Sequence, residues 1–109
     1  MGQERRRAAR FPFVGLADII LESSGARTSA RMREISLYGC RVDADILLAP
    51  KTRVLVRIFR RAEFIEAAAS VVYASLDLGI GLAFHRIEPD FERLLKRWLL
   101  HAEIGRAHV

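Results

Sequence analysis

Arg53-Val54-Leu55-Val56-Arg57-Ile58-Phe59 is the stretch whose pattern predicts its structure most directly. Val54, Val56 and Ile58 share one parity, and side chains of one parity lie on the same face of a β-strand. β-branched residues also favour an extended backbone. The stretch therefore predicts a strand with one face against a core.

The segments before and after this stretch are also rich in β-branched, aliphatic or alternating residues that favour strands, and turn-forming residues separate them. The predicted strands are 14–22, 27–35, 40–44, 53–59, 63–76 and 80–85. Within 63–76, the run Glu66-Ala67-Ala68-Ala69 favours a helix, whereas Val71-Val72-Tyr73 favours a strand. Alternating apolar residues through this segment favour the strand. Turns about ten residues apart predict a small antiparallel barrel or sandwich.

After Pro89 the periodicity of the apolar residues changes to that of a helix. One helix face is formed at the spacing i, i+3, i+4, i+7 and i+8 by Phe91, Leu94, Leu95, Trp98 and Leu99. Proline suits the first turn of a helix because its missing N–H has no partner there. We therefore expect strands followed by one amphipathic helix that packs on them.

The 109 residues form a single small domain. No apolar run approaches the ~18 residues of a membrane span, and no apolar segment of a secretory signal follows the first residues. The single cysteine, Cys40, cannot form an internal disulfide. These features predict a cytoplasmic protein without a membrane span.

The predicted domain comprises residues 13–102, and the segments before and after it are interpreted separately. Residues 1–12 form a basic segment, with Arg5, Arg6, Arg7 and Arg10 close together, and are expected to be a flexible arm. Residues 103–109 back-translate onto a common sequencing-adapter sequence. We interpret this tail as adapter read-through, which leaves the natural end of the chain open.

Several kinds of catalytic site are disfavoured. No histidine pairs with Cys40 or with an acid at a metal-ligand spacing, and no glycine-rich phosphate loop occurs. Cys40 lies in a predicted strand and is expected to be a buried structural thiol. Asp43 and Asp45 lie beside a turn and are expected to be solvated. The sequence therefore predicts a protein that is not an enzyme and holds no metal or cofactor.

The net charge of +5 is carried almost entirely by arginine, with only Lys51 and Lys96 as lysines. A GC-rich genome is one explanation of this bias. A functional explanation is equally open, because the planar guanidinium pairs bidentately with phosphate and with the O6/N7 edge of guanine.

Two short motifs give the chain a resemblance to a known family. Arg6-Arg7-Ala8-Ala9-Arg10 is an R-x-x-x-R run, and Glu34-Ile35-Ser36-Leu37-Tyr38-Gly39 is an acid-x-Ser-x-x-Gly step between two strands. In this order, ahead of a strand series and a terminal helix, they resemble the bacterial PilZ domains, which are receptors for the second messenger cyclic di-GMP. The resemblance extends from about Arg5 to about Leu100 and includes the last strand, Gly79-Ile80-Gly81-Leu82-Ala83-Phe84.

The resemblance implies a six-stranded antiparallel split β-barrel closed by one amphipathic helix. It also implies non-catalytic binding of cyclic di-GMP, with ordering of the arginine arm over the barrel as the signal to an effector protein or a fused output domain. The residues that match the family's ligand-binding motifs are Arg6, Arg10, Glu34, Ser36 and Gly39. The neighbouring residues that either assist the ligand or face solvent are Arg5, Arg7 and Arg41.

Glu34 departs from the family pattern, which has Asp or Asn at this position. The departure leaves open a PilZ-like interaction module that has lost its nucleotide. A third reading is a basic barrel that binds nucleic acid, which the positive charge suits. The strands disfavour that reading, because none shows the pair of exposed aromatic residues that binders of single strands use.

Overall fold

The structure, a computed structural model, describes residues 9–107, and it describes side chains as far as residue 102. A series of strands is followed by one helix. The elements are β1 (Phe11–Pro12), β2 (Leu16–Leu21), β3 (Arg27–Ile35), β4 (Gly39–Asp43), β5 (Arg53–Arg60), β6 (Glu63–Ser75), β7 (Gly79–Arg86) and α1 (Pro89–Ala107).

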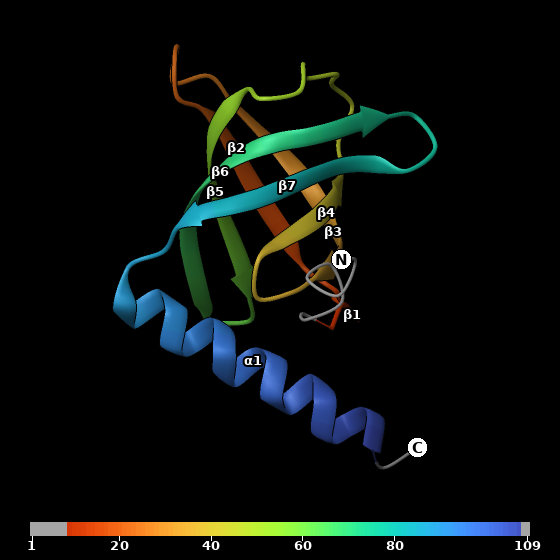
Figure 1. The fold of residues 1–109 in the computed structure, drawn as a ribbon, viewed down its shortest axis with the longest axis vertical. Helices are drawn as coiled ribbons and strands as arrows, with labels where there is room; N and C mark the ends of the chain where they lie inside the picture. Colours follow the sequence, from red (N-terminus) through yellow and green to blue (C-terminus); the bar gives the residue numbers. More distant parts are fainter. Residues whose placement is uncertain (1–8, 108–109) are drawn as a thin grey trace, which may run out of the picture.

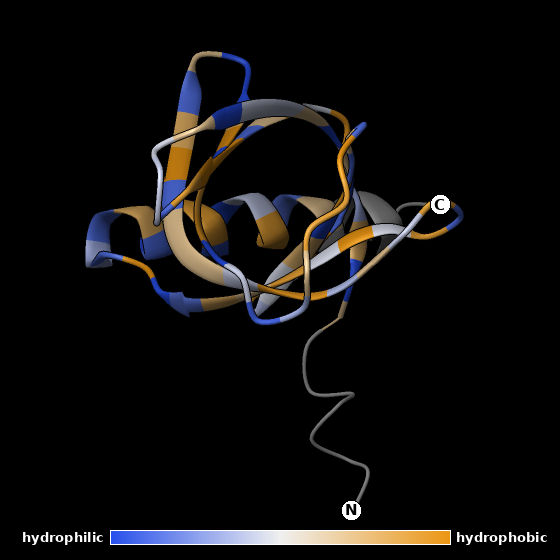
Figure 2. Ribbon diagram, turned by 90° about the horizontal axis from the view of Figure 1, so that it is seen from above, coloured by the Kyte–Doolittle hydropathy of each residue, from blue (hydrophilic) through white to orange (hydrophobic). Residues whose placement is uncertain are grey.

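Six of these strands close into an antiparallel barrel (Figure 1). The strands follow one another in the order β3-β2-β5-β6-β7-β4, and the pairing of β3 with β4 completes the ring. Seen from above, the strands surround a common interior, and α1 passes beneath them (Figure 2). The expectation of a six-stranded antiparallel barrel with one closing helix is confirmed.

β1 is an additional strand that no sequence pattern predicts, because two residues are too short to show periodicity. It pairs with the end of β3 in the register Phe11↔Ile35 and Pro12↔Glu34. Between β1 and β2, the Phe13 N–H donates to the carbonyl of Arg33 at 3.1 Å. The last two residues of the segment expected to form the arm are therefore attached to the barrel wall.

The predicted strands agree closely with the observed ones. Residues 27–35 match β3 at both ends, the predicted starts of β5 and β6 are also correct, and the remaining strand bounds differ by one or two residues. The first strand starts at Leu16 rather than at Val14, and the Val14 side chain is almost fully exposed. The helix backbone continues to Ala107, into the segment interpreted as an adapter-derived tail.

The core is formed by the inward-facing residues of the barrel strands. The predicted parity of β5 is confirmed, because Val54, Val56 and Ile58 are completely buried. The alternate residues of β6 from Ile65 to Val71 are buried in the same way. Burial of one β-branched or leucine side chain contributes about 1.5–3 kcal/mol, so these faces supply most of the stabilisation of the barrel.

β3 and β6 each contain an extra residue at which the alternation of inward and outward side chains is interrupted, and β7 contains a further one at His85. The pairing of β3 with β4 shifts at Arg33, and that of β6 with β7 shifts at Val72. Such β-bulges turn the following side chains to the other face of the sheet. The bulges at Arg33 and Val72 lie next to the pocket described below.

The helix covers one end of the barrel with its predicted apolar face. Leu95 and Trp98 are buried, whereas Phe91, Leu94 and Leu99 pack partly buried against the core. The Trp98 indole N–H donates to the Glu63 carboxylate at 3.0 Å, and its ring lies 5.5 Å from that of Phe13. One aromatic side chain therefore joins the helix to the β5–β6 turn and to the chain just after β1.

Replacing Trp98 by alanine should lower the free energy of unfolding by about 3–5 kcal/mol, because a large buried aromatic group is removed and a cavity remains. Leu100→Ala is the control, since Leu100 lies on the same helix but is mostly exposed, and should change stability by less than about 0.5 kcal/mol. Urea denaturation of both variants measures the difference. Equal, small losses would contradict the packing role of Trp98.

Candidate functional site

One row of residues across five strands forms the floor of the candidate site. The registers of neighbouring strands place side by side Pro12 of β1, Glu34 of β3, Arg41 of β4, Gly81 of β7 and Tyr73 of β6. Because β1 pairs with β3 beside Glu34, Arg10 is brought to this row. The register of the sheet thus unites the end of the R-x-x-x-R motif with the start of the acid-x-Ser-x-x-Gly motif.

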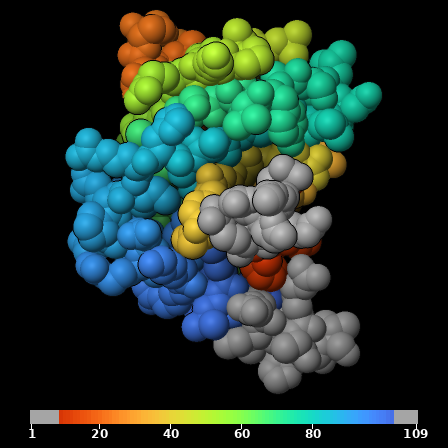
Figure 3. Space-filling view, viewed as in Figure 1, coloured from red at the N-terminus to blue at the C-terminus, as the bar shows by residue number. Residues whose placement is uncertain are grey.

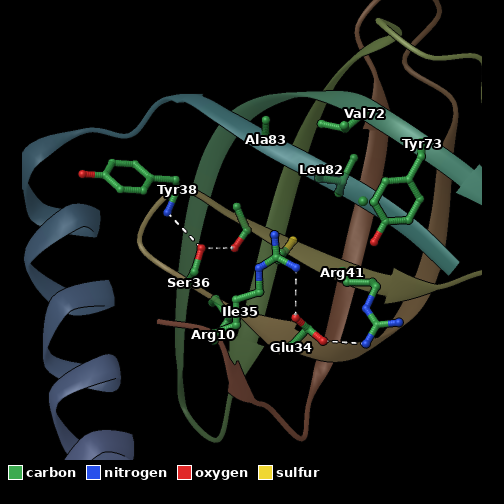
Figure 4. A pocket seen from close by; sticks show the side chains of 13 residues that line it. Arg10, Glu34, Ile35, Ser36, Tyr38, Arg41, Val72, Tyr73, Leu82 and Ala83 are labelled. Atoms are coloured by element: carbon green, nitrogen blue, oxygen red, sulfur yellow. Dashed lines mark hydrogen bonds and ion pairs between the residues drawn. The ribbon is translucent and has the colours of Figure 1, made fainter. Parts of the chain in front are cut away.

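Glu34 lies between two arginines, and both point toward its carboxylate (Figure 4). A guanidinium nitrogen of Arg41 lies 2.5 Å from one carboxylate oxygen, and one of Arg10 lies 3.8 Å from the other. The hydrogen bond with Glu34 raises the pKa of Arg41 above its ordinary value. Arg41 also donates to the carbonyl of Leu78 at 3.1 Å. Glu34 is therefore held firmly by Arg41 and loosely by Arg10.

The outward position of Glu34 is a consequence of the bulge in β3. Ala30 and Met32 are buried, and Glu34 has the same parity, so an unbroken strand would turn its carboxylate toward the core. The extra residue, Arg33, reverses the alternation, so that Glu34 faces the site and Ile35 enters the core. Arg33 itself pairs with Asp43 at 3.1 Å on the barrel surface.

Ser36 and Gly39 build the turn between β3 and β4. The Ser36 hydroxyl accepts a hydrogen bond from the Tyr38 N–H at 3.2 Å and donates to the Gly39 carbonyl at 3.3 Å. A Cβ atom on Gly39 would lie 2.2 Å from the carbonyl oxygen of Leu82, so only glycine allows β4 to approach β7 this closely. Both residues therefore shape the edge of the site through the backbone.

A pocket of about 190 Å³ opens on this row. Its walls combine charged groups with apolar and aromatic side chains from β3, β4, β6 and β7. The residues that line it are Arg10, Glu34, Ile35, Ser36, Tyr38, Gly39, Cys40, Arg41, Val72, Tyr73, Gly81, Leu82 and Ala83. In the space-filling view, β6 and β7 form a continuous wall above the helix on this side of the molecule (Figure 3).

The sequence model of the PilZ domain matches residues 4–101, which is most of the chain. The chain belongs to the PilZ domain family. A comparison with curated protein sequences found no significant match.

Solved structures of other PilZ proteins share this fold at low sequence identity. The PilZ domain of YcgR from Escherichia coli, solved with c-di-GMP, superposes with a TM-score of 0.74 at 16% identity, over 95% of each chain. YcgR in complex with c-di-GMP gives a TM-score of 0.77 at 17% identity, over 95% of this chain and 48% of that one. The PilZ domain of CeSA from a cellulose-synthesizing bacterium gives a TM-score of 0.69 at 15% identity, over 87% of this chain and 98% of that one.

The predicted site residues of this PilZ domain fall into two groups. The structure brings five of them to one pocket: Arg10, Glu34, Ser36, Gly39 and Arg41. The other three lie outside the described residues: Arg5, Arg6 and Arg7. Their assignment remains a prediction.

Val72 and Tyr73 are pocket residues that the motifs did not indicate. A signal was present in Gly81, since a glycine inside a strand often marks a close approach of a neighbour. A Cβ atom there would lie 2.3 Å from the ring of Tyr73, which covers this glycine. The bulge at Val72 leaves that side chain half exposed at the pocket wall.

Cys40 is buried in the wall of the pocket, as expected of a structural thiol. Burial raises its pKa to about 12, so the reactive thiolate is disfavoured at neutral pH. Among the side chains that the structure describes, no three of His, Cys, Asp or Glu are grouped so that they could hold a metal ion. The helix in the described part of the chain lacks the length of apolar sequence that a membrane span needs.

Proposed function

We propose that this PilZ domain binds cyclic di-GMP in the pocket beside Glu34, without catalysis. The observation that carries the proposal is the meeting of Arg10 with Glu34 next to the Ser36–Gly39 turn. Residues from the two sequence motifs that match the family's ligand motifs thus line a single pocket. The two similar YcgR structures are complexes with c-di-GMP, which supports the same ligand here.

Arg10 is the residue best placed to change partners when the ligand arrives. Its side chain is 73% exposed, and its ion pair with Glu34 is long. Such surface pairs contribute only ~0–1 kcal/mol, whereas a charge-assisted hydrogen bond to phosphate contributes ~1.5–3 kcal/mol. The guanidinium fork also fits two phosphate oxygens or the O6/N7 edge of guanine. Arg10 therefore binds the ligand at a small cost to the free protein.

Glu34 recognises the base rather than the phosphate. Its carboxylate accepts hydrogen bonds from N–H groups, and the N1–H and N2–H₂ groups of guanine provide them. Arg41 fixes one carboxylate oxygen at 2.5 Å, which orients the group and offsets its charge. Tyr38 and Tyr73 line the same pocket, and aromatic faces stack on nucleobases.

Binding orders the arginine arm across the barrel, and this ordering is the signal. Ordering costs ~1–2 kcal/mol of backbone entropy per residue, so it occurs only when the ligand provides compensating bonds to Arg6 and Arg10. The arm leads directly into β1, which is paired with β3 beside Glu34. An effector protein or a fused output domain then binds the ordered surface.

Arg10→Ala should weaken cyclic di-GMP binding about a hundredfold, because two or more charge-assisted bonds are lost. Arg10→Lys should recover little of the affinity, since an ammonium group lacks the planar fork. Titration calorimetry at physiological salt measures the three dissociation constants.

The matched control is Arg27→Ala, which removes the same charge seven residues from Glu34 along β3, roughly 23 Å away. This variant should bind within about twofold of the wild type, because the Debye length is only ~8 Å. Equal losses for both variants would mean that diffuse positive charge binds the ligand. If the calorimeter detects binding of a single-stranded oligonucleotide but not of cyclic di-GMP, the protein is better interpreted as a nucleic-acid-binding barrel. If it detects binding of neither ligand, a protein-interaction module that has lost its nucleotide is favoured.

Glu34→Asp restores the residue type of the family and should bind at least as tightly as the wild type. Glu34→Ala should weaken binding about tenfold or more, because the acceptor for guanine is lost. The comparison is made by the same calorimetric titration. Unchanged or tighter binding by Glu34→Ala would show that the carboxylate only pairs with arginines and does not contact the ligand.

Amide hydrogen exchange of Arg6 to Arg10 tests the proposed signal. Exchange in this segment should slow at least tenfold when cyclic di-GMP is added, because ordered amides in a bound segment are protected. The amides of Val54, Val56 and Ile58, which are buried in the barrel core, provide an internal control and should change little. Equal exchange of the arm with and without ligand would refute the switch and leave binding itself unaffected.

A further inference from the structure

A second surface lies on the outer face of β2, β3 and β4, next to the ligand pocket. The strand registers place Leu16, Arg31 and Asp43 side by side in one row. The segment after β4 and the β6–β7 turn border this row, and together they enclose a hollow of about 780 Å³. We call this hollow and its rim the β3 face.

Large apolar side chains stand exposed around the β3 face. Leu16 is 60% exposed, Leu47 is 69% exposed and Leu76 is 93% exposed, and all three line the same hollow. Each comes from a different part of the chain: β2, the segment after β4, and the β6–β7 turn. Exposed leucines that gather around one hollow, with charged groups between them, are typical of a surface that another protein covers.

The charges on the β3 face are balanced, although the chain as a whole carries +5. Two cations and two anions line the hollow: Arg31, Arg33, Asp43 and Asp45. Arg33 and Asp43 pair with each other at 3.1 Å. Within the described side chains, Arg31 and Asp45 have no ion-pair partner and are both exposed. The face thus presents one unpaired cation and one unpaired anion.

We propose that the β3 face binds a second copy of this chain, related by a two-fold axis. In such a dimer the same patch meets itself, so every contact occurs twice. A patch can meet itself only if its charges are self-complementary. The two unpaired groups satisfy this condition, because Arg31 of each subunit can pair with Asp45 of the partner subunit while the leucines cover one another.

The balance of charge argues against other occupants. A nucleic acid or an acidic protein would require an excess of cations, and a basic protein would require an excess of acids. Arg31 and Asp45 offer one charge of each sign. Only a surface with the opposite arrangement of the same two charges pairs with both, and a rotated copy of the β3 face has that arrangement.

Sedimentation equilibrium of the ligand-free protein, over a wide concentration range, tests the dimer. The wild type should show a monomer–dimer equilibrium. Arg31→Glu and Asp45→Arg should each raise the dissociation constant about tenfold or more, because each change places two like-charge contacts in the interface. The double variant Arg31→Glu/Asp45→Arg should return to within about threefold of the wild type, since the pairs are re-formed with exchanged signs.

Two more variants separate the apolar contact from general effects. Leu47→Glu should weaken the dimer at least tenfold, whereas Arg53→Glu, on β5 two strands away from β3, should leave it unchanged. Leu47 is exposed, so its variant should retain the melting temperature of the folded domain. A wild type that stays monomeric at all concentrations, or a double variant as weak as the single ones, would overturn the proposal. The experiment contains no nucleotide, so its outcome is independent of cyclic di-GMP binding.

Discussion

The pairing of β3 with β4 is the interaction on which the rest of this structure depends. It is the contact that turns an open sheet into a closed barrel, and it involves only the second half of β3, from Arg31 to Ile35. Gly39 makes it feasible, because β4 must lie against β7 at the same time and has no room there for a Cβ atom. The bulge at Arg33 lies inside this pairing. Barrel closure and the outward turn of Glu34 are therefore produced by the same few residues.

The charges of the pocket suit a ligand that offers both phosphate and hydrogen-bond donors. Arg10, Arg41 and Glu34 sum to +1, from two cations and one anion. The negative carboxylate of Glu34 repels a simple phosphate ion, whereas it can accept hydrogen bonds from the N–H groups of a guanine. In the proposed complex, the carboxylate of Glu34 favours a guanine nucleotide over other anions, while it lowers the attraction of the pocket for anions in general. Arg41 limits this loss of attraction for anions, because its ion pair with Glu34 offsets the negative charge of the carboxylate.

Alternating and helical periodicity predicted the long strands and the helix, because each of them buries one face over most of its length. The closed six-stranded barrel was implied by the resemblance to the PilZ family, since periodicity left a barrel and a sandwich equally open. The short β1 carries no periodicity and could not be predicted this way. The bulges are likewise invisible in a single sequence, since Arg33 looks like any other outward residue. Of the site, the motifs indicated Arg10, Glu34 and their neighbours. They did not indicate Tyr73, because its place in the pocket wall depends on the register between β6 and β7, which no local pattern encodes.

Trp98 is the only tryptophan of the chain, and its position gives the domain a built-in optical probe. The indole is buried at the junction of the helix with the β5–β6 turn, and its ring lies 5.5 Å from Phe13, three residues after Arg10. Its emission therefore reports on the polarity around Phe13 and the β5–β6 turn. Movement at this junction can be followed by intrinsic fluorescence in the unmodified protein, without an attached dye.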